Sequence, residues 1–78
     1  MSTVTYYVAQ PFELTKRGHL VAGQAQQAQT ESAAIRRAEV LAKKGGAVAF
    51  KRTGDPSSGD FEDAVILKQF GMVPDDFI

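Results

Sequence analysis

One segment of the sequence, residues 31–44, has the spacing of an amphipathic helix, and the rest of the chain must fold around it. Its apolar residues recur at positions that share one helix face: Ala34, Ile35, Ala38, Leu41 and Ala42. Thr30 is a suitable N-cap, and the negative charge of Glu31 is favoured in the first turn. Gly45 is typical of the position just past a helix end. We therefore predict a helix over about residues 31–44.

Strand-like segments flank this helix on both sides. β-Branched, aromatic and aliphatic residues dominate four of them: residues 3–10, 19–24, 47–52 and 61–70. A turn at 15–18 joins the first two and a polar loop at 53–60 joins the last two, whereas residues 24–29 are interpreted as a strand end and a connection. The order ββαββ predicts an α+β fold in which one helix packs on a mainly antiparallel sheet of about four strands.

The length of 78 residues suits one small domain over residues 1–78, which ends in a tail at residues 71–78. The chain has no cysteine, so neither a disulfide nor a thiolate metal site can supplement its core. The first residues lack a basic leader, and the aliphatic runs are too short for a membrane span. We expect a soluble, cytoplasmic protein that does not enter a membrane.

The predicted helix is too narrow to cover the predicted sheet. A helix of about 14 residues is about 10 Å across, whereas four strands span about 19 Å. Alternation along residues 61–70 places Val65 and Leu67 on the face opposite Ile66 and Phe70, so the strand is apolar on both sides. Either the tail folds back over that face or a second copy docks there. We expect a dimer and take Val65, Leu67 and Phe77 as candidate self-association residues.

The net charge is zero, but the charges are unevenly distributed. Residues 16–52 hold eight basic and two acidic side chains, whereas residues 53–78 hold six acidic and one basic. The candidate anion-binding residues are those on the polar side of the helix: Arg36, Arg37, Lys43 and Lys44. Their presence leaves open a weak nucleic-acid-binding function, which we do not favour because no RNP-type pattern accompanies them.

The remaining chemical signals do not form a known catalytic or cofactor pattern. His19 is the sole histidine, and no nucleophile elbow surrounds Ser57 or Ser58. The carboxylates of residues 55–63 lack the register of a calcium loop, and the glycines lack phosphate-loop spacing. We expect no catalytic residue, cofactor or metal, and interpret the chain as a non-enzymatic protein-interaction domain that self-associates through its sheet.

The C-terminal part resembles a family of short bacterial proteins that has no assigned activity. The resemblance lies in the run GAVAFKRTGDP at residues 46–56, followed by GD at 59–60, DAVIL at 63–67, FG at 70–71 and VPDD at 73–76. It implies a bacterial origin and that the loop and the tail are family features. It implies no catalytic residue.

Overall fold

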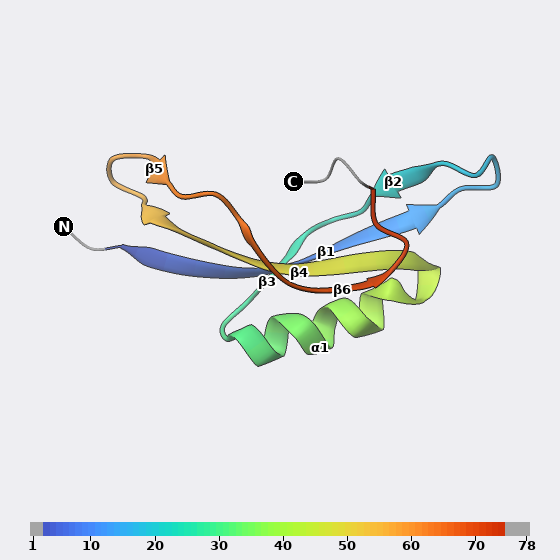
Figure 1. The fold of residues 1–78 in the computed structure, drawn as a ribbon, viewed down its shortest axis with the longest axis horizontal. Helices are drawn as coiled ribbons and strands as arrows, with labels where there is room; N and C mark the ends of the chain where they lie inside the picture. Colours follow the sequence, from blue (N-terminus) through green and yellow to red (C-terminus); the bar gives the residue numbers. More distant parts are fainter. Residues whose placement is uncertain (1–2, 75–78) are drawn as a thin grey trace.

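A computed structural model describes residues 3–74, which form one helix and a curled antiparallel sheet of six strands (Figure 1). This confirms the predicted α+β class. The elements in chain order are β1 (Val4–Leu14), β2 (Leu20–Ala22), β3 (Gln26–Ala28), α1 (Glu31–Leu41), the 3₁₀ turn η1 (Ala42–Lys44), β4 (Gly45–Asp55), β5 (Asp60–Phe61) and β6 (Val65–Gly71).

The two long strands β1 and β4 form the centre of the sheet and pair antiparallel from Val4 opposite Gly54 to Glu13 opposite Gly45. β2 and β3 both pair with the outer edge of β1, and β5 and β6 both pair with the outer edge of β4. Six strands therefore occupy four positions across the sheet, so the prediction of about four strands is only roughly right.

Several strand boundaries differ from the prediction. β1 continues past residue 10 to Leu14, and β4 continues past residue 52 to Asp55, into the segment that was expected to be a loop. β3 lies within residues 24–29, which were expected to be a strand end and a connection, and it forms by pairing with Tyr7–Ala9 of β1. The strand expected at 61–70 is divided into β5 and β6, and residues 62–64 between them are outside any strand. These differences arise because strands pair with residues distant in sequence, and that pairing outweighs local strand propensity.

The helix forms where its start signals predict. The Thr30 hydroxyl accepts a hydrogen bond from the Ala33 amide at 3.1 Å, which satisfies one of the free N–H groups of the first turn. Regular α-helix ends at Leu41 and continues as the 3₁₀ turn η1, so the predicted end at residue 44 includes both.

The core between helix and sheet consists of small side chains. Five alanines are fully buried there: Ala34 and Ala38 of α1, Ala9 of β1, and Ala47 and Ala49 of β4. Larger side chains surround them, including Tyr7, Ile35, Leu41, Leu67 and Phe70. Because alanine has only a methyl group, this composition brings the helix close to the sheet.

A β-bulge in β6 changes which residues of this strand face the helix, so the predicted faces are wrong after the bulge. Ala49 lies opposite Lys68 and Phe50 opposite Ile66, so Leu67 is an extra residue in β6. Leu67 and Phe70 consequently both pack against the alanine core under α1. The expectation that Leu67 lacks cover, and that Phe70 shares a face with Ile66, is wrong for this reason.

The chain after β6 covers one end of the opposite, helix-free face. The Met72 amide donates to the Gly45 carbonyl at 3.0 Å, and a Cβ on Gly46 would overlap the Met72 backbone. Phe12, opposite Gly46, and Val48, two residues along β4, are buried at this end. The chain turns here to the side away from α1 (Figure 1). The start of the predicted tail thus contributes cover, whereas Phe77 lies outside the described residues.

At the other end of the sheet, the start of β1, the end of β4 and β5 extend past the helix (Figure 1). We call this part the ribbon: residues 4–7, 51–55 and 60–61. It contributes to an elongated molecule with extents of 47, 22 and 17 Å. Within residues 3–74, no helix is long and apolar enough to cross a membrane.

Candidate functional site

The helix-free face of the sheet carries a continuous group of apolar side chains. Val8, Phe50 and Ile66 lie side by side across β1, β4 and β6. Strand alternation adds Tyr6 and Val4 of β1, and Phe61 lies opposite Gly54, the partner of Val4. We call these six residues the open-face patch: Val4, Tyr6, Val8, Phe50, Phe61 and Ile66.

Two members of the open-face patch contact each other, and the neighbouring Arg52 contacts one of them. The Tyr6 and Phe61 rings are 6.1 Å apart between centroids, and the Arg52 guanidinium lies 5.5 Å from the Phe61 centroid. Arg52 also donates to the Glu62 carbonyl at 3.0 Å. Val4 and Phe61 are nevertheless 39% and 38% exposed, and the other four members are partly buried. The patch therefore exposes apolar area on the helix-free face.

The candidate self-association residues lie elsewhere. Val65 is 51% exposed, but it lies opposite Lys51 and so faces the same side of the sheet as Tyr7 and the helix. Leu67 packs on the core, and Phe77 is outside the described residues. Sequence reasoning missed the open-face patch because the bulge and the β1–β4 register decide which apolar residues share a face.

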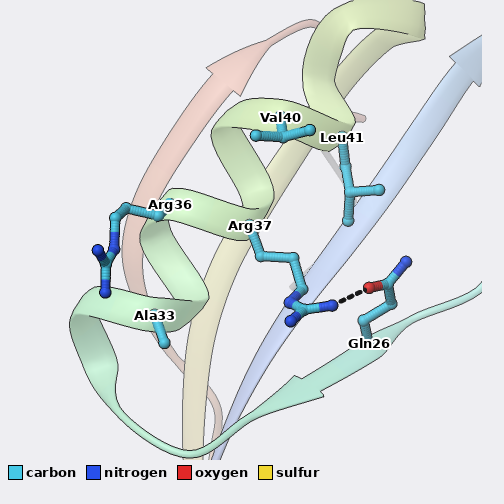
Figure 2. A pocket seen from close by; sticks show the side chains of 6 residues that line it. All are labelled: Gln26, Ala33, Arg36, Arg37, Val40 and Leu41. Atoms are coloured by element: carbon cyan, nitrogen blue, oxygen red, sulfur yellow. Dashed lines mark hydrogen bonds between the residues drawn. The ribbon is translucent and has the colours of Figure 1, made fainter.

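The four basic residues expected to bind anions line two neighbouring hollows, two residues in each. A hollow of about 480 Å³ along α1 is lined by Gln26, Ala33, Arg36, Arg37, Val40 and Leu41 (Figure 2). A second hollow of about 360 Å³ includes Lys43 and Lys44 in its lining and shares Gln26, Val40 and Leu41 with the first. We call the two together the α1 groove.

Two guanidinium groups flank an apolar line in this groove. Figure 2 shows Arg36 and Arg37 on opposite sides of the line from Ala33 to Val40. Arg37 donates a hydrogen bond to the Gln26 side-chain oxygen at 2.6 Å, so β3 holds its position. The basic residues follow from the sequence, but the role of Gln26 does not, because only the pairing of β3 with β1 brings it beside the helix.

The acidic loop between β4 and β5 is a structural turn. Asp55 accepts hydrogen bonds from the Ser57 hydroxyl at 2.6 Å and the Ser57 amide at 2.9 Å. These bonds favour the carboxylate and hold the pKa of Asp55 below its ordinary value. Over residues 3–74, no group of three His, Cys, Asp or Glu side chains is arranged to hold a metal ion.

His19 and the loop serines are far apart. His19 belongs to the β1–β2 turn, where its amide donates to the Thr15 hydroxyl, whereas Ser57 and Ser58 belong to the β4–β5 loop. Figure 1 shows these two turns at opposite ends of the sheet. They therefore do not form a catalytic pair with each other.

Comparison with known proteins found no matching family model, no matching curated protein and no matching solved structure. The resemblance of the C-terminal part to a family of short bacterial proteins stays a prediction. Function is therefore derived from the two surfaces, the open-face patch and the α1 groove.

Proposed function

We propose that this protein is a small non-enzymatic interaction protein that pairs with a second copy of itself through the helix-free face of its sheet. The observation that carries the proposal is the open-face patch. Its central row, Val8, Phe50 and Ile66, runs across three adjacent strands on the side away from α1. A sheet with an apolar face gains free energy when that face packs against another layer.

The size of the face suits such a contact. A specific interface of standard size removes about 800 Å² of accessible surface from each partner. The described structure exposes 5494 Å², so an interface of that size would take about one-seventh of it. The open-face patch draws its residues from four strands, β1, β4, β5 and β6, which makes it a broad centre for such a contact.

The edges of the sheet favour packing through the face over pairing through an edge. β2 and β3 have three residues each and β5 has two, so these edges offer few consecutive hydrogen-bonding groups. β6 is longer but carries the bulge at Leu67 and the charge of Lys68. Bulges and lysines are features that oppose the addition of another strand.

The same patch on both copies gives a two-fold symmetric contact. Packed sheets lie about 10 Å apart, with side chains of the two inner faces interdigitating. The row of Val8, Phe50 and Ile66 would then lie near the two-fold axis, and the Tyr6–Phe61 pair would lie farther out.

Analytical ultracentrifugation over a concentration series tests the proposal. We expect a mass that rises toward twice 8.4 kDa with concentration. Ile66→Lys places a charge in the central row and should shift the protein to monomer. Val65→Lys is the matched control, because Val65 is the preceding residue of β6 but faces the helix side, and it should leave the dimer unchanged.

Circular dichroism checks that both variants fold. If Ile66→Lys does not fold, Phe61→Ser provides a second test at a more exposed member of the patch. A wild-type protein that stays monomeric at the highest concentration overturns the proposal. So does a dimer that Val65→Lys disrupts and the patch variants do not.

A further inference from the structure

We propose that the α1 groove binds an acidic amphipathic peptide segment of another protein. This inference is independent of self-association, because the groove lies along α1 and the open-face patch lies on the opposite side of the sheet. It rests on three features of the described residues: an exposed apolar line, an excess of cations around it, and the absence of an accessible ring in its lining.

The apolar line is centred on Val40. This side chain is 60% exposed, more than any other large hydrophobic residue in the described part of the chain. Valine also has a lower helix propensity than the straight-chain residues that suit an exposed helix position. Ala33 lies two turns earlier on the same side, and Leu41 lies beside Val40 in the groove. The line therefore offers apolar contact area that the fold itself leaves uncovered.

Cations surround that line. Arg36 and Arg37 lie on its two sides, and Lys43 and Lys44 line the adjoining part of the groove. Among residues 3–74, the one carboxylate in the lining is Glu13, at the lysine end. Arg37 uses one donor for Gln26 and has further N–H donors for a carboxylate. The excess of positive charge selects an acidic partner.

The spacing of the cations fits a short peptide. Arg36 and Lys43 are seven residues apart, which corresponds to about 10 Å along a helix axis. A helical peptide presents side chains at i and i+7 over the same distance, with an apolar residue between them at i+3 or i+4. Acidic groups at the two ends would meet the arginines and the lysines while the apolar residue contacts Val40.

A nucleic acid fits the groove less well. Single-stranded nucleic acids are held by aromatic side chains on which their bases stack, together with basic residues for the phosphates. In the described part of the chain, Phe12 is the one aromatic residue in the lining, and it is only 4% exposed. The exposed Val40 gives a phosphate backbone nothing to bind, so the groove favours a peptide.

Selection from a random-peptide library on the immobilised full chain tests this proposal. We expect the selected peptides to be rich in Asp and Glu, with apolar residues spaced three or four positions from the acidic ones. A synthetic peptide of the consensus sequence, labelled with a fluorophore, then gives the affinity by fluorescence polarisation. The protein carrying Arg36→Glu and Arg37→Glu should bind it about tenfold or more weakly, as should Val40→Asp.

Matched controls separate the groove from general charge and apolarity. Lys16→Glu changes a basic residue of the β1–β2 turn, and Val21→Asp changes an exposed valine of β2. Both should bind the consensus peptide as the wild type does. Amide NMR spectra of each variant confirm that it folds and show whether the peptide perturbs the resonances of α1.

Three outcomes of the peptide experiments overturn the proposal. They are selection that yields no enrichment over the doubly charge-reversed protein, selected peptides without acidic residues, and a consensus peptide that binds the control variants as weakly as the groove variants. Labelled single-stranded DNA and RNA are tested in parallel. Salt-dependent binding of either that is tighter than binding of the consensus peptide also overturns the proposal, in favour of a nucleic acid.

Discussion

The two faces of the central β1–β4 pair differ in the size of the side chains that they carry. Under α1, the strands contribute the methyl groups of Ala9, Ala47 and Ala49, which are fully buried against the helix. On the opposite face, the same strands present Tyr6, Val8 and Phe50, which no helix of residues 3–74 covers. The covered face uses small residues so that a helix can approach closely, whereas the helix-free face keeps large residues at its surface.

This difference indicates which residues determine stability and which are available for association. A close-packed layer of alanines tolerates little change in volume, because neighbouring atoms have no room to move. A partly exposed layer tolerates change but retains apolar area that is available to a partner. We therefore expect mutations under α1 to affect folding and mutations in the open-face patch to affect association.

The largest expected effect comes from enlarging a side chain between α1 and the sheet. Ala38→Leu adds three carbon atoms at a fully buried position and should destabilise the protein by about 2–3 kcal/mol. Urea denaturation followed by circular dichroism measures the loss. Val40→Leu, on the exposed side of the same helix, is the control and should change stability by less than about 0.5 kcal/mol. Equal effects of the two variants would show that the alanine layer is not close-packed.

A smaller effect is expected at the covered end of the helix-free face. Gly46→Ala places a methyl group where the Met72 backbone lies, so residues 71–74 must move away. We expect a loss of about 1–2 kcal/mol, typical of overpacking. Hydrogen exchange of the Met72 amide, which is bonded to the Gly45 carbonyl, should become faster. An unchanged exchange rate in the folded variant would show that this segment does not depend on Gly46.

The N-cap of the helix should have a more modest effect. Thr30→Ala removes the hydroxyl that accepts from Ala33 and should cost about 1 kcal/mol. Thermal denaturation measures this change, and Thr30→Ser, which keeps the hydroxyl, should recover most of it. A serine variant as unstable as the alanine variant would show that the hydroxyl does not account for the stabilising effect of Thr30.

The smallest effect is expected at the tip of the ribbon, where Asp55 accepts hydrogen bonds from the Ser57 hydroxyl and amide. Its pKa is lower in the folded chain, so its contribution to stability is present above its ordinary pKa. That contribution is lost as the pH falls through the folded value. Ser57→Ala removes the hydroxyl that donates to Asp55, so a carboxyl-carbon NMR titration should find the pKa of Asp55 closer to its ordinary value. No change in the titration midpoint would exclude this hydrogen bond as the main cause.

Local signals in the sequence predicted the helix and its cap correctly, because Thr30, Glu31 and the apolar spacing act within a few residues of one another. They did not predict β3, since glutamine and alanine have no strand preference and this strand exists through its pairing with β1. They also did not predict the bulge at Leu67, which depends on the register between β4 and β6.

The candidate sites show the same contrast between local signals and pairing of residues that are distant in sequence. The basic residues of the α1 groove could be predicted because they lie within one continuous segment, α1 and the turn η1 that follows it. Gln26 could not, because it comes from β3. The open-face patch needs the register of four strands, so alternation along any one of them does not define it.

Self-association through the open-face patch is tested most directly by an isotope-filtered NOE spectrum of a mixed sample. In this sample, half of the molecules carry ¹³C-labelled methyl groups and half are unlabelled. Contacts between copies are then seen separately from contacts within one copy. The account predicts intermolecular NOEs from the methyl groups of Val8 and Ile66 to the aromatic protons of Phe50 in the other copy. Intermolecular NOEs confined to Val65 on the helix side, or none at a concentration well above the dissociation constant for the dimer, would contradict it.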